Sequence, residues 1–233
     1  MLAIALALSS ALLWGTGDFL GGLAARRFAL VWVLMFSALG GLTLGIAGGL
    51  LSGEALPPAE DLLLGALAGI CGVVALGAFY RALAIGTMSI VAPITATGAA
   101  IPVLWGVIGR GESLSAFAVF AILVAVAGVI LASREQDLAE TTGVDAATHR
   151  QSVVLAIVAA IGFGTIFALI AEAADEAIYW PAVALKLTTL TIILVVIAVS
   201  VRRLPSWGER PRGRQWLFPF SIGFFAVGAN ITF

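Results

Sequence analysis

The sequence has little charge, one cysteine and one histidine. Only 11% of its 233 residues are charged, and the net charge is −1. A water-soluble domain needs about a quarter of its residues charged to cover its surface, so the composition excludes one. A net charge near zero also leaves no basic face for nucleic acid. Cys71 has no disulfide partner, and His149, in a polar segment, has no second histidine with which to bind a metal. We therefore expect no metal, no cofactor and no catalytic centre.

What the chain does contain is long apolar runs, with 61% hydrophobic residues. A helix needs about 20 apolar residues to cross the hydrocarbon core of a bilayer. The runs lack the alternation of transmembrane strands, so they predict an all-α integral membrane protein folded as a multi-helix bundle. No basic segment precedes the first run, which we interpret as a membrane span and not as a cleaved signal peptide. Eight runs qualify: 2–23, 29–51, 61–83, 88–109, 114–133, 152–173, 178–200 and 215–233.

Parts of the sequence repeat. Residues 6–16 align with 155–165 without a gap, Val31-Trp32 align with Tyr179-Trp180 after a slip of one residue, and 69–79 align with 223–233. Because the first copy holds five spans, an odd number, the second copy enters the membrane in the opposite orientation. The alignment predicts two inverted five-helix repeats. The first covers 1–133 and the second, incomplete with its first three helices, covers 152–233, with a polar linker at 134–151 between them.

The loop charges invert as such a repeat requires. The loop after the first span is basic and the loop after the second is acidic, whereas the loop after the sixth is acidic and the loop after the seventh is basic. Inverted repeats are common in secondary transporters, whose substrate site lies near the bilayer midplane. Most of the 12 Lys and Arg residues follow odd-numbered spans. The positive-inside rule therefore predicts cytoplasmic odd-span loops and an external N-terminus.

Several short motifs carry a family resemblance. They are Trp14-Gly15, the segment 79–83 (FYRAL) running into 88–93 (MSIVAP), Pro102, and 111–114 (GESL) before the fifth span. In this order they resemble the drug/metabolite transporter superfamily, specifically its EamA-like branch with two five-helix repeats. That resemblance implies ten spans, of which about eight are present here. Since Phe233 is the repeat counterpart of Phe79, we expect a sequence truncated before its last two helices.

Two ionisable residues lie within predicted spans. An aspartate near midspan costs about 2.5–3.5 kcal/mol on insertion, so Asp18 is expected to face a cavity or a partner. The resemblance to small multidrug resistance proteins, which carry an essential carboxylate in their first helix, implies that Asp18 binds a proton or a cationic substrate. The alternative is a hydrated residue near the interface. Lys186, near the middle of the seventh run, either attracts an anionic group, pairs with Asp18, or has a structural role.

The remaining candidates are polar, aromatic or proline residues. Proline removes a backbone donor, which membrane helices tolerate where neighbours or a water-filled cavity satisfy the freed carbonyl. The fourth span therefore predicts either a cavity wall with exposed hydroxyls or a kink used for packing. The aromatic residues are interpreted as cavity walls or as packing and interfacial anchors, and Asn230 as a cavity residue or an interhelical hydrogen-bonding group. The candidate cavity residues are Trp14, Asp18, Tyr80, Pro93, Thr95, Thr97, Phe163, Lys186 and Asn230.

These observations favour a secondary transporter, a permease or exporter that moves a small metabolite or drug-like molecule by alternating access. No nucleotide-binding loop is present, so an ion or substrate gradient would drive it, with a proton as the candidate coupling ion. The expected partners are the small-molecule substrate and the lipid bilayer, with no nucleic acid. The composition suggests a bacterial plasma membrane. The alternatives are a membrane-embedded enzyme, which would need clustered His, Asp or Cys, and a non-transporting scaffold or sensor subunit.

Overall fold

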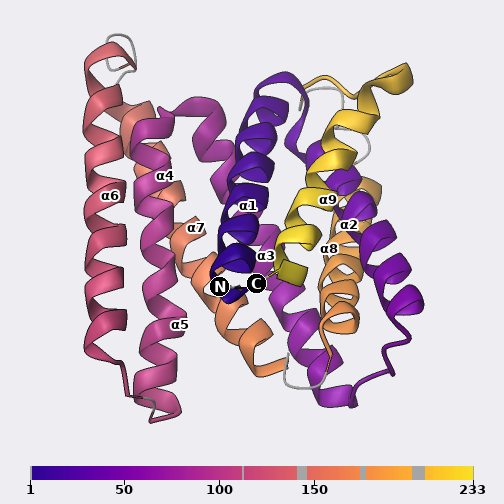
Figure 1. The fold of residues 1–233 in the computed structure, drawn as a ribbon. Helices are drawn as coiled ribbons and strands as arrows, with labels where there is room; N and C mark the ends of the chain where they lie inside the picture. The colour runs from indigo at the N-terminus through magenta and orange to yellow at the C-terminus, as the bar shows by residue number, and fades with distance from the viewer. Residues whose placement is uncertain (1, 112, 141–145, 174–176, 201–207, 233) are drawn as a thin grey trace.

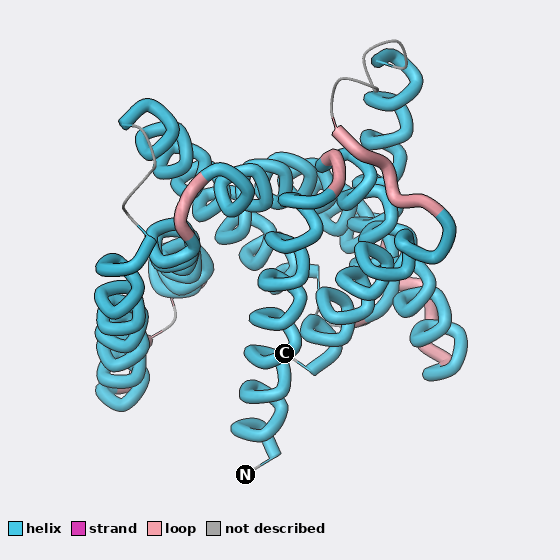
Figure 2. Tube along the Cα trace, turned by 90° about the horizontal axis from the view of Figure 1, so that it is seen from above, coloured by secondary structure: helices cyan, strands magenta, loops and turns pink. Residues whose placement is uncertain are grey.

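A computed structural model describes residues 2–111, 113–140, 146–173, 177–200 and 208–232. Helices joined by short loops make up these residues, with no strand among them (Figure 2). The predicted all-helical class is thereby confirmed. The fourth predicted run is one helical stretch broken into four segments: α4 (Met88–Ala96), η1 (Thr97–Ala99), α5 (Ala100–Leu104) and the π-helical turn η2 (Trp105–Gly109). The other helices are α1 (Leu2–Arg27), α2 (Leu30–Ser52), α3 (Ala59–Ile85), α6 (Ala116–Glu140), α7 (Ala146–Ala173), α8 (Tyr179–Ser200) and α9 (Leu217–Thr232), preceded by the short η4 (Gly213–Trp216).

Each of the eight predicted runs corresponds to one helical stretch. Within the described residues, five stretches are long and apolar enough to cross a membrane: α2, α3, the broken helix 88–109, α7 and α8. Because a bilayer offers no hydrogen-bonding partners, a spanning segment satisfies its backbone internally as a helix. Two boundaries differ from the prediction. Helix α6 continues to Glu140 and α7 begins at Ala146, so helix extends into both flanks of the polar segment 134–151.

The helices pack mostly with partners far along the chain. Helix α3 packs against α7 and α8, while α9 packs against α1 and α2, and α2 also packs against α8 (Figure 1). The broken helix packs against α7. Helix α6 lies at the edge of the bundle in both views, with α4 as its main partner (Figures 1 and 2). The centre of the bundle is therefore built from α1, α2, α3, α7, α8 and α9.

The two ends of the bundle differ in charge. At one end the Ala29 N–H donates to the Glu209 carbonyl (2.8 Å) and the Arg26 Nε donates to the Leu83 carbonyl (3.1 Å). These bonds bring together the basic α1–α2 junction, the end of α3 and the arginine-containing segment before α9. At the other end Glu54, between α2 and α3, lies against the start of α8. The described parts of the loops thus place arginines mainly at one end and carboxylates mainly at the other.

Candidate functional site

An aromatic cluster links α1, α3 and α7. The ring of Trp14 on α1 stacks on Phe167 of α7, with centroids 4.4 Å apart and planes 19° apart. One turn earlier on α7, Phe163 meets Phe79 of α3 edge-on, at a centroid distance of 5.6 Å. The structure therefore brings the predicted residues Trp14 and Phe163 onto the same helix contact region. Phe167 was not predicted, although its spacing of four residues from Phe163 on one helix face is a signal that could have found it.

Asp18 lies one turn beyond Trp14 on α1 and is half-buried. The ring of Tyr80, which is 2% exposed, packs against Gly21 on the next turn of the same helix. Gly21 comes three residues after Asp18, so the Tyr80 ring lies beside the turn of α1 that follows Asp18. The side of α1 that carries Trp14 and Asp18 is thus the side that meets α3 and α7. Two predicted residues, Asp18 and Tyr80, are brought together by this arrangement.

Lys186 on α8 is 6% exposed and projects between α2 and α9. Its Cε lies 2.9 Å from the position that a Cβ on Gly41 would take, and a methyl of Val227 lies 3.0 Å from the same point. Among the described residues its ammonium has no hydrogen bond or ion pair, and in particular it does not pair with Asp18. An unpaired ammonium in the protein interior is energetically costly.

Asn230 lies on α9, the helix whose Val227 is next to Lys186. It is half-buried on α9, three residues after Val227 and therefore on an adjacent part of the same helix face. The cavity residues predicted from sequence thus fall into two groups. Trp14, Asp18, Tyr80 and Phe163 lie on α1, α3 and α7. Lys186 lies where α2, α8 and α9 meet, and Asn230 lies farther along α9.

The remaining predicted candidates, Pro93, Thr95 and Thr97, lie on the broken helix. The hydroxyl of Thr95 donates to the Val91 carbonyl (2.8 Å) and that of Thr97 to the Ile94 carbonyl (2.6 Å), so both are satisfied within their own helix. Pro93 has no N–H to donate to the carbonyl four residues earlier, that of Ser89. The Ser89 hydroxyl, also buried, has no hydrogen-bond partner among the described atoms. Ser89, which was not predicted, therefore has a hydroxyl without a partner in the described part of the chain, whereas the threonine hydroxyls are bonded.

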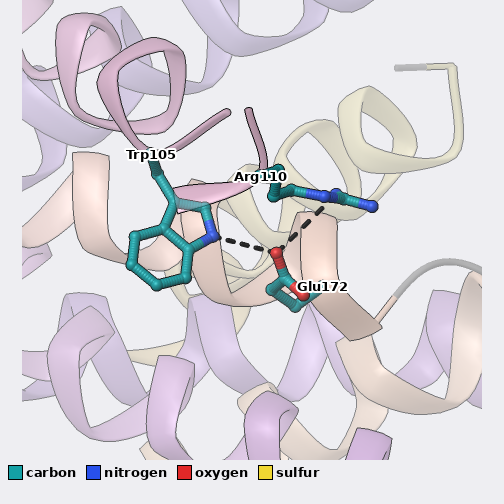
Figure 3. A network of polar contacts seen from close by, with 3 residues as sticks. All are labelled: Trp105, Arg110 and Glu172. Carbon is teal, nitrogen blue, oxygen red and sulfur yellow. Dashed lines mark hydrogen bonds and ion pairs between the residues drawn. The ribbon is translucent and has the colours of Figure 1, made fainter. Parts of the chain in front are cut away.

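Glu172 was also missed by sequence reasoning. The Trp105 Nε1 donates to its Oε1 (2.9 Å), and the Nη1 of Arg110 lies 3.6 Å from the same oxygen (Figure 3). This network ties the π-helical turn η2 to the end of α7, at the acidic end of the bundle. No set of three His, Cys, Asp or Glu side chains in the described chain lies close enough to hold a metal ion.

Helices long and apolar enough to cross a membrane, a proline-broken helix and two ionisable side chains within the bundle define a polytopic helical membrane protein. Residues 1–134, more than half of the chain, match the EamA-like transporter family, and the chain belongs to that family. The resemblance drawn from the short motifs is thus confirmed. No curated protein and no solved structure matches the chain. Membership of this family and the apolar helices indicate a membrane transporter for a small molecule, in a family that is typically not enzymatic.

Proposed function

We propose that the chain is a secondary transporter that moves a small metabolite or drug-like molecule across the plasma membrane by alternating access. The observation that carries the proposal is the way the central helices pair. In the sequence repeat, α1 is equivalent to α7, α2 to α8 and α3 to α9. Under this equivalence the α3–α7 contact corresponds to the α9–α1 contact, and the α3–α8 contact corresponds to the α9–α2 contact. All four contacts are observed. The α2–α8 contact is exchanged with itself. Such a pairing is what two structural repeats packed about a pseudo-two-fold axis would produce.

Individual residues support the same exchange. The sequence repeat aligns Gly69 with Gly223, and the register of the two tryptophans, Trp32 and Trp180, aligns Ser37 with Leu185. In the structure a Cβ on Gly69 would meet the Leu185 carbonyl oxygen, and a Cβ on Gly223 would meet the Ser37 carbonyl oxygen. Residues that are equivalent in the two sequence alignments therefore make equivalent contacts in the structure.

The directions of the helices agree with an inverted repeat. In Figure 1, α1 rises from the marked N-terminus while α7 descends. Inverted repeats place the substrate site near the midplane, where one repeat rocks against the other. Alternating access by such a rocking motion is therefore the mechanism that the arrangement favours.

The interior charges suggest how the substrate is held. Lys186 would bind an anionic group of the substrate, because that contact would offset the cost of keeping its ammonium without a partner. The aromatic rings of Trp14 and Phe167 would form an apolar wall. Asp18 beside Tyr80 would take a coupling proton or a cationic group of the substrate. Asp18 lies on α1 of the first proposed repeat and Lys186 lies on α8 of the second, as expected for a site at the interface between repeats.

Transport by reconstituted protein tests this function. Proteoliposomes would be screened by counterflow with labelled metabolites, and gradient-driven accumulation would separate a transporter from an enzyme or a scaffold. We expect Lys186→Met to lower transport by about tenfold or more, which corresponds to the loss of one charge-assisted contact. The control is Cys71→Ala, which removes only a half-buried thiol. Unchanged kinetics for Lys186→Met would assign that residue a structural role.

Transport unaffected by a collapsed proton gradient would exclude proton coupling.

A further inference from the structure

A cavity lies at the basic end of the bundle, away from the interior charges. Its volume is about 350 Å³, and it opens between α2 and the segment that leads into η4. Two aromatic side chains of α2 and two arginines of the segment contribute to its wall. The lining residues are Trp32, Phe36, Arg210, Pro211, Arg212 and Gly213.

The backbone that carries the two arginines is held in place. The Ala29 N–H at the start of α2 donates to the Glu209 carbonyl (2.8 Å), which fixes the segment beside that helix. The Arg212 N–H donates to the Gln215 Oε1 (3.0 Å), and the Gln215 N–H donates to the Arg212 carbonyl (3.1 Å). Neither arginine side chain forms an ion pair with an acidic residue in the described part of the chain. Two arginines without an ion-pair partner in the described residues therefore line this pocket.

An aromatic row leads away from this pocket, from the end of η4 along α9. Trp216 lies beside Phe36 at a centroid distance of 6.2 Å, Phe220 lies 5.4 Å from Trp216, and Phe224 lies 5.4 Å from Phe220. The spacing of four residues puts the three rings on one face of the helix. Trp216 is 37% exposed and Phe224 is 38% exposed. The row thus offers an apolar surface that runs from the pocket along a helix of the bundle.

We propose that this pocket binds the phosphate group of an anionic phospholipid, with an acyl chain lying along the aromatic row of α9. A guanidinium matches phosphate with paired hydrogen bonds, and tryptophan favours the headgroup level of a bilayer. Basic pockets at the ends of transmembrane helices are typical headgroup sites. A free phosphate would use the arginines but not the aromatic row, and for that reason we assign the site to a lipid.

Lipid selectivity of the full chain tests the assignment. The protein would be reconstituted in phosphatidylcholine, and quenching of tryptophan fluorescence would be titrated with phosphatidylglycerol brominated in its acyl chains, with brominated phosphatidylcholine as reference. We expect a preference for phosphatidylglycerol that the double variant Arg210→Gln/Arg212→Gln lowers by about fivefold or more. Arg210→Lys/Arg212→Lys keeps the charge but not the planar fork, so its preference should be intermediate.

The matched control removes the same charge outside the pocket. Arg150→Gln/Arg214→Gln neutralises two exposed arginines of the same end that do not line the cavity. It should keep the preference within about twofold. An equal loss in both double variants would show attraction by the whole basic end and overturn the proposal, as would an unchanged preference in both. Displacement of the lipid by millimolar inorganic phosphate would reassign the pocket to a soluble anion and overturn it as well. None of these outcomes depends on transport.

Discussion

At the scale of single residues, two glycines set how closely the central helices approach. A Cβ on Gly223 would overlap the Ser37 carbonyl and the Gly41 backbone nitrogen of α2. A Cβ on Gly69 would press on the Leu185 carbonyl and on the Thr188 Cβ, 2.8 Å away, in α8. Small residues at helix crossings are the usual way to pack helices inside a membrane, where lipid provides no hydrophobic drive for their association. The crossings of α2 with α9 and of α3 with α8 therefore depend on these two positions.

A single methyl group should be enough to disturb such a crossing. We expect Gly223→Ala to lower the free energy of unfolding by about 1–3 kcal/mol, because the added Cβ meets backbone atoms that cannot rotate away. The matched control is Gly77→Ala in α3, where a Cβ would meet nothing within 4 Å. That substitution should leave stability unchanged or raise it by up to about 1 kcal/mol through helix propensity. Unfolding titrations in mixed micelles would measure both, and equal midpoints would contradict the tight crossing.

The residue scale also shows how far the candidate site could be predicted. Asp18 and Lys186 stand out in the sequence because a charge inside an apolar run is rare and costly. The sequence does not reveal that Asp18 and Lys186 are apart, because their separation depends on how the helices pack. Thr95 and Thr97 looked like free hydroxyls, yet each bonds a carbonyl of its own helix. Ser89 looked unremarkable in sequence, but its buried hydroxyl is the one without a partner among the described atoms.

At the scale of helices, the start of α8 is capped by a residue from another part of the chain. The Glu54 carboxylate accepts the backbone N–H groups of Ile178 (2.9 Å), Tyr179 (3.0 Å) and Trp180 (3.2 Å). The indole of Trp180 donates in turn to the Glu54 carbonyl (2.9 Å). The first N–H groups of a helix have no partner within the helix, and its dipole favours a negative charge there. The Glu54 carboxylate provides both the hydrogen-bond acceptors and the negative charge, and these bonds hold the α2–α3 loop against α8.

Removing that charge should weaken the junction. We expect Glu54→Gln to lower the free energy of unfolding by about 1–2 kcal/mol, because the amide keeps one acceptor oxygen but loses the second and the charge. Glu172→Gln is the control, since its ion pair with Arg110 is partly exposed on both sides and its Oε1 can still accept from Trp105. It should cost less than about 1 kcal/mol. The measurement is the unfolding midpoint of each purified variant, and a larger loss for Glu172→Gln would contradict the capping role.

At the scale of the whole molecule, the bundle has a basic and an acidic end. The ends of α1 and α3, the start of α7 and the segment before α9 lie at the basic end, which is held together by Arg26, Ala29 and Glu209. Glu54 and Glu172 lie at the other end. The positive-inside rule counts Lys and Arg near the ends of spans, so this polarity bears directly on orientation.

The polarity predicts which end faces the cytoplasm. In a Cys71→Ala background, Glu60→Cys at the start of α3 should react with a membrane-impermeant maleimide in intact cells. Arg150→Cys near the start of α7 should react only after the cells are opened, because the basic end is expected inside. Both parent side chains are exposed, so access from the aqueous phase is the variable under test. The reverse labelling pattern would place the basic end outside and refute the external N-terminus.

The sequence by itself determined the class of protein, the rough limits of the helices in the described residues, the break in the fourth run and the family. These follow from local properties, because about 20 apolar residues must span the bilayer and must satisfy their backbone as a helix. Only the tertiary structure decided which helices pair, that Trp14 stacks on Phe167, and that Glu54 caps α8. Helices that are apolar all round carry no stripe that marks a partner. The contacts that decide the pairing join residues more than a hundred positions apart, and so they depend on the packing of the whole bundle.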